Sequence, residues 1–174
     1  MARPNFSMVT RQQSLGKPSA VKRNRPSPGP RYAALIQLLR TAEELWNASR
    51  VFFARWNLSP SQFNLLNVLS DFPDGCTQSD LSRQLIMHRS NVTGLVDRLA
   101  ERGLVTRKEN ATDRRAWLVV LTPAARKLLA ELLPHYHAAA EQVWGKLPAA
   151  RAEKLVSELA VIAENATRIA NAKS

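Results

Sequence analysis

The spacing of apolar residues departs from the helical pattern in one stretch of this chain of 174 residues, and that stretch limits the folds open to it. Up to Gly103, apolar side chains recur every three or four residues, as they do in amphipathic helices. From Leu104 to Lys108 and from Trp117 to Leu121 the pattern is that of two β-strands, joined by a charged loop. Helical spacing returns after Thr122. The sequence therefore predicts a mainly α-helical fold with one small β-hairpin, called the wing below.

Capping residues and prolines divide the helical part into segments. Ser59, Thr77 and Thr122 each have a side chain that can cap a helix, and proline follows two of them directly. Helices are predicted over about 31–56, 60–70, 78–85, 89–102, 123–144 and 149–172, with Pro134 expected to kink the fifth. Residues 57–121 then form a winged helix-turn-helix. The long helices in 31–56 and 122–172 flank it and are predicted to join two copies of the chain.

Basic residues are concentrated in two stretches of the sequence. Residues 1–31 hold seven basic residues and no acid, and residues 83–127 hold ten basic and four acidic residues. The second stretch falls on the predicted helix-turn-helix and wing, so a polyanion is its natural partner. Residues 1–30 contain four prolines after position 17 and are predicted to be a disordered basic tail, in which Met8 is an alternative start.

The helix predicted over 89–102 separates a buried face from an exposed one. Val92, Leu95, Val96 and Leu99 share the inner face. The outer face and first turn carry side chains that hydrogen-bond to bases and phosphates, while a glycine there lets a backbone approach closely. Together with the basic residues of the wing, the predicted DNA contacts are Arg89, Ser90, Asn91, Thr93, Gly94, Arg98, Lys108, Asp113, Arg114 and Arg115.

Residues 32–172 resemble the MarR-type winged-helix transcriptional regulators. The resemblance is carried by the run from Arg89 to Val105, by Asp113-Arg114-Arg115 and by Leu121-Thr122-Pro123, at matching spacing. The resemblance implies a homodimer on a pseudo-palindromic operator in double-stranded DNA, with the helix over 89–102 in the major groove; the cytoplasmic location is predicted separately, because a single cysteine fits a reducing compartment. The resemblance further implies that Arg115 enters the minor groove, oriented by Asp113, and that a small-molecule effector relieves repression.

Two features depart from the pattern of that family. His88 stands where the family has a better capping residue, and Ile86 stands where the turn has glycine. The single cysteine, Cys76, is not in the first helices, where the peroxide sensors of the family carry theirs. A small buried residue is the simpler interpretation of Cys76, and a reactive thiol is the alternative.

Other classes of protein are less compatible with the sequence. No apolar run is long enough to span a bilayer, and no secretory leader is predicted. No nucleophile with a base, phosphate-binding glycine loop or metal cluster is found, so we expect no enzyme, cofactor or metal. A winged helix that binds proteins instead of DNA is the main alternative. It needs an exposed apolar patch, whereas this wing is charged.

Overall fold

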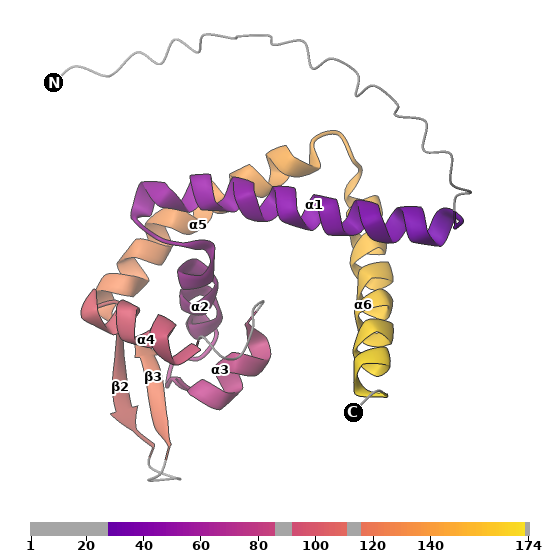
Figure 1. Cartoon of the computed structure of the whole chain (residues 1–174). Coiled ribbons are helices and arrows are strands. Elements are labelled where there is room, and N and C mark those ends of the chain that lie inside the picture. Colours follow the sequence, from indigo (N-terminus) through magenta and orange to yellow (C-terminus); the bar gives the residue numbers. More distant parts are fainter. Residues whose placement is uncertain (1–27, 86–91, 111–115, 173–174) are drawn as a thin grey trace, which may run out of the picture. The chain divides into compact units, whose positions relative to one another are not determined.

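The computed structural model describes residues 28–85, 92–110 and 116–172, which divide between two compact units, Met1–Glu43 and Glu44–Ser174. The helices are α1 (Pro30–Phe53), α2 (Pro60–Ser70), α3 (Gln78–Gln84), α4 (Val92–Glu101), α5 (Pro123–Trp144) and α6 (Ala149–Asn171), with a 3-10 turn at Ala54–Trp56 after α1. The strands are β1 (Cys76–Thr77), β2 (Val105–Glu109) and β3 (Trp117–Leu121). The fold is therefore mainly helical with a small sheet, as predicted (Figure 1).

Three helices begin where the capping residues predicted. Ser59 accepts a hydrogen bond from the Gln62 backbone, and the Gln62 side chain accepts one from the Ser59 N–H, which completes a capping box. Thr77 caps α3 and Thr122 caps α5 in the same way, each accepting from a backbone N–H three residues on. Each contact satisfies an N–H that the helix itself leaves unpaired. The fifth helix continues through Pro134.

The sheet has one strand more than the sequence predicted. Its order is β1-β3-β2, and all neighbours are antiparallel. The wing is the pair β2 and β3, seen beside one another in Figure 1, with Arg107 opposite Val119. The additional strand β1 pairs Cys76 with Val119 and joins the first residues of the helix-turn-helix to the wing.

The core lies between the helix-turn-helix, the sheet and the first half of α5. Leu65, Leu66, Leu81, Leu99 and Leu132 have no exposed surface at all. Phe53 at the end of α1 stacks on Phe63 of α2, with ring centroids 4.2 Å apart. The inner face of α4 is buried as predicted, since Val92, Leu95, Val96 and Leu99 are each at most 3% exposed. Burial of this face fixes which face of α4 points outward.

Gly103 ends α4 in a left-handed conformation, with φ of +67°. Its N–H donates to Ala100, and the N–H of Leu104 donates to Leu99, which together form a Schellman motif. The Thr122 hydroxyl donates to the Gly103 carbonyl at 2.7 Å, so the end of α4 is also tied to the start of α5. These bonds determine where the chain turns from α4 into the wing.

Candidate nucleic-acid interface

The structure places part of the predicted DNA-contact set on the outer surface of α4 and the wing. Thr93 and Arg98 are exposed on α4, Gly94 is half-buried between them, and Lys108 is exposed on β2. The remaining predicted contacts are Arg89, Ser90, Asn91, Asp113, Arg114 and Arg115, which lie outside the described residues.

The outer surface of α4 divides into two rows of residues. One row contains Gly94 and Arg98, which are four residues apart and therefore lie on one face. Arg98 forms no hydrogen bond or ion pair with any residue that the structure describes. The other row contains Thr93 and Asp97, and both of these side chains contact a neighbouring element. The row with Arg98 is thus the one available to a ligand.

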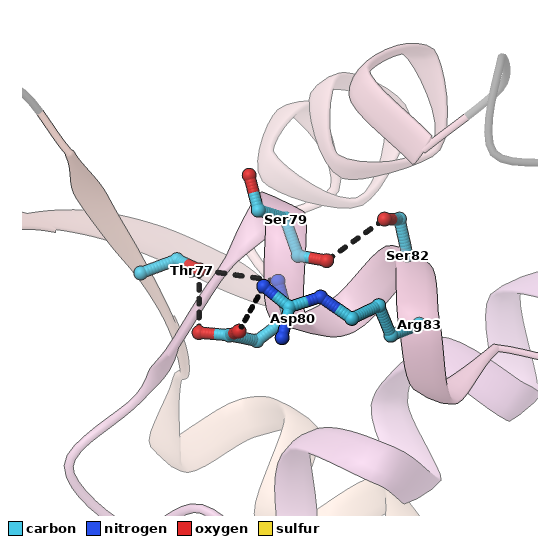
Figure 2. A network of polar contacts seen from close by, with 5 residues as sticks. All are labelled: Thr77, Ser79, Asp80, Ser82 and Arg83. Atoms are coloured by element: carbon cyan, nitrogen blue, oxygen red, sulfur yellow. Dashed lines mark hydrogen bonds and ion pairs between the residues drawn. The ribbon is translucent and has the colours of Figure 1, made fainter.

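Thr93 is held by the preceding helix. Its hydroxyl donates to the side-chain carbonyl of Gln78, the first residue of α3, at 3.1 Å. The first turn of α3 is itself fixed by side chains (Figure 2). Asp80 accepts a 2.7 Å hydrogen bond from the Thr77 hydroxyl and pairs with Arg83 at 3.1 Å.

Asp97 is held by the wing. Its carboxylate forms an ion pair with the guanidinium of Arg107 on β2, and both side chains are partly exposed. The C-terminal end of α4 is fixed as well, because the side chain of Arg102 donates to the backbone carbonyl of Asn57 at 2.7 Å. These contacts tie α4 to α3, to the wing and to the segment that leads into α2.

Three residues of this surface were not predicted from the sequence: Gln78, Asp97 and Arg107. The spacing of Asp97 from Thr93, one helical turn, could have placed it on the outer face. No local pattern identifies its partner Arg107, which lies ten residues further along the chain.

A hollow of about 290 Å³ lies between the start of α3 and the strands of the wing. Thr77, Gln78 and Ser79 line one side, and Arg107, Ala116 and Trp117 line the other. Trp117 is 52% exposed, although it stands on a strand whose next core position, Val119, is fully buried. The surface beside α4 is therefore polar with one exposed aromatic ring.

Cys76 is buried in β1, as its interpretation as a small core residue predicted. Burial, followed by the nearby Asp80 carboxylate, raises the pKa of the Cys76 thiol. A raised pKa disfavours the thiolate, which is the reactive form. Within the described residues no group of three histidine, cysteine, aspartate or glutamate side chains could hold a metal ion, and no helix is long and apolar enough to cross a membrane.

The arrangement of α2, α3, α4 and a β-hairpin defines a winged helix-turn-helix protein. Comparison with known sequences supports the same class. A profile of the MarR family matches residues 56–116, and HosA of Escherichia coli O157:H7, a transcriptional regulator, is 30% identical over 108 residues that cover 59% of this chain and 79% of HosA. The chain belongs to the MarR family.

Other relatives match over shorter or more divergent stretches. The transcriptional repressor MprA of Escherichia coli K12 is 35% identical over 77 residues, which span 44% of each chain. The solved structure of Bordetella bronchiseptica BpsR has a TM-score of 0.69 at 27% identity and covers 79% of this chain and 98% of BpsR. AbsC of Streptomyces coelicolor has a TM-score of 0.74 at 22% identity, covering 82% of this chain and 98% of AbsC, which shows the shared fold.

Proposed function

We propose that this protein is a sequence-specific transcriptional regulator that binds double-stranded DNA as a homodimer. The observation that carries the proposal is the division of α4 into a fully buried inner face and an outer face on which Arg98 has no ion pair with a described residue, next to a charged wing. A helix anchored along one face can enter the major groove with the other. The net charge of residues 83–127 favours a phosphate backbone as the partner.

The side chains of this surface have distinct proposed roles. Arg98 and Lys108 bind phosphates, and Gly94 allows the backbone of α4 to approach the groove. Ser90 and Asn91 read base edges together with Arg89. Arg115 enters the minor groove with Asp113 orienting it, and Arg114 contacts the phosphate backbone of the DNA. The proposed roles of residues 89–91 follow from their place in the first turn of the predicted helix, and those of Arg115 and Asp113 follow from the sequence resemblance.

The homodimer is supported by apolar side chains that one chain leaves exposed. No residue of α6 is buried, although the helix carries several large aliphatic side chains. A single helix with an uncovered apolar stripe is unfavourable in water, and a second copy can cover it. The exposed large apolar residues of the long helices include Leu35, Leu39, Leu45, Trp46, Val143, Val156, Val161, Ile162 and Ile169.

The direction of regulation and the effector are proposed from relatives. MprA is named a repressor, and the BpsR structure concerns regulation of its DNA binding by 6-hydroxynicotinic acid. We therefore expect this protein to repress transcription in the cytoplasm and a small aromatic acid to weaken its binding to DNA. Titration of the protein–DNA complex with 6-hydroxynicotinic acid gives a first probe of that expectation.

A matched pair of arginine variants tests the proposal. Arg98→Ala removes a charge from the outer face of α4, and Arg168→Ala removes the same charge from α6. Arg98→Ala should weaken binding to a selected DNA duplex about tenfold or more, because hydrogen bonds to charged groups are strong. Arg168→Ala should bind nearly as tightly as the parent. Equal, small losses in both variants would contradict a DNA-binding role for α4.

A further inference from the structure

One side-chain hydrogen bond joins the two helices of the helix-turn-helix within the part of the chain that the structure describes. It runs from the Thr93 hydroxyl, in the first turn of α4, to the Gln78 side chain at the start of α3, and the donor–acceptor distance is 3.1 Å. Apolar residues of both helices, such as Leu81 of α3 and Leu95 and Val96 of α4, belong to the same buried core. Apolar packing has little directionality, whereas a hydrogen bond weakens steeply when its angle changes.

Gln78 is well placed to act as a fixed point for α4. It follows the capping residue Thr77, whose hydroxyl accepts from the Asp80 backbone and donates to the Asp80 carboxylate (Figure 2). Leu81, one turn further along α3, is fully buried. The backbone of Gln78 is therefore anchored on both sides, and its side chain reaches α4 from a rigid turn.

The bond also changes what Thr93 can offer to DNA. A threonine hydroxyl has one proton to donate, and Gln78 accepts it. One turn along the same row, Asp97 is engaged by Arg107. The row of Thr93 and Asp97 is thus committed to contacts within the protein, and the row of Gly94 and Arg98 faces the ligand.

We propose that Gln78 is a positioning residue for DNA recognition, which sets the rotation of α4 about its axis through Thr93, and that Thr93 orients the helix and does not read a base. This inference rests on the proposed function. Its consequence is that selectivity among DNA sequences depends on a residue of α3 that itself contacts no base.

The test uses full-length protein and two duplexes, one selected by the parent from a random pool and one scrambled version of it. The measured quantity is the ratio of the two dissociation constants. Gln78→Ala and Thr93→Val should each reduce that ratio roughly 2- to 10-fold, the effect of one hydrogen bond. The double variant should lose no more than either single variant, because both changes break the same contact.

Two conservative variants separate positioning from a merely structural role. Thr93→Ser keeps the donor and should keep the ratio. Gln78→Glu keeps the acceptor, so it should also keep the ratio, but its added negative charge should weaken binding to both duplexes alike. Unfolding midpoints of all variants show whether stability alone accounts for any loss.

Three results would overturn the inference. The first is a ratio unchanged by Gln78→Ala. The second is a pair of single effects that multiply in the double variant, as expected if Thr93 reads a base by itself. The third is a parent protein that binds the selected and the scrambled duplex equally well. That result would overturn the proposed function too, and it is told apart from the other two because it is seen without any substitution.

Discussion

The carboxylate of Asp97 in α4 and the guanidinium of Arg107 in β2 form an ion pair that joins the outer surface of α4 to the wing. Both side chains remain partly accessible, 48% for Asp97 and 35% for Arg107, so water screens the attraction and its contribution to folding is small. The value of the pair is geometric. We expect it to hold the angle between α4 and the wing, the two elements that are proposed to enter adjacent grooves of DNA.

Replacing Asp97 shows whether its ion pair with Arg107 affects DNA binding by positioning the wing or only through net charge. Asp97→Asn makes the protein more positive, so electrostatics alone predicts tighter binding to all DNA. If the ion pair positions the wing, the variant instead discriminates less well between the selected duplex and its scrambled version. We expect that loss, with a change in the free energy of unfolding of no more than about 1 kcal/mol. Fluorescence anisotropy on both duplexes measures it, and improved discrimination would refute the geometric role.

Local sequence signals predicted the boundaries of the helices well. The caps at Ser59, Thr77 and Thr122 lie where expected because a cap depends only on residues within one turn. The inner face of α4 was predictable for the same reason, since helical periodicity is a local property.

Contacts between distant segments could not be predicted in this way. The two residues of β1 have no strand pattern of their own and become a strand only by pairing with β3. The bond between Gln78 and Thr93 likewise depends on how α3 packs on α4, so Gln78 was missed as part of the site. Thr93 was correctly placed on the exposed surface, but its hydroxyl already has a partner in the protein.

Gly75 is expected to tolerate substitution much less than Gly103. Both have positive φ, +101° and +67°. A Cβ atom at Gly75 would lie 2.7 Å from Val120 Cγ2 and 2.9 Å from the Val119 carbonyl oxygen. A Cβ atom at Gly103 would have no such neighbouring atom within 4 Å. Gly75→Ala should therefore cost about 2–4 kcal/mol and Gly103→Ala about 1–2 kcal/mol. Urea unfolding of the two variants compares them, and equal costs would show that the strand β1 can shift to make room.

Burial of Cys76 predicts a specific loss of stability in alkaline solution. The pKa of its thiol is raised in the folded protein, so the unfolded chain loses that proton first as the pH rises. The contribution of the buried neutral thiol to the free energy of unfolding is complete below the thiol pKa of the unfolded chain, about 8.5. It is lost as the pH rises through the higher pKa of the folded protein. Cys76→Ala should lack this decline. Urea unfolding between neutral and alkaline pH tests it, and parallel curves for parent and variant would exclude the effect.

A charge on α6 should separate the proposed dimer. Ile162 is 46% exposed in one chain, so Ile162→Glu leaves the core of the monomer intact. In a dimer the new carboxylate would be buried without a partner, which is costly. Light scattering should give twice the chain mass of 19.4 kDa for the parent and a lower mass for the variant. Thr167→Glu, on the same helix, is the control and should remain dimeric, and a monomeric parent would exclude the homodimer.

The measurement that most directly tests the account is selection of duplexes from a random pool by the full-length protein. A two-fold dimer presents two copies of α4, so the enriched sequences should form a pseudo-palindrome whose half-sites are about 10 bp apart, centre to centre. The variant Arg98→Ala should enrich the same pool poorly. Enrichment of asymmetric single sites, or of no sequence at all, would contradict the proposal that this winged helix-turn-helix reads DNA as a dimer.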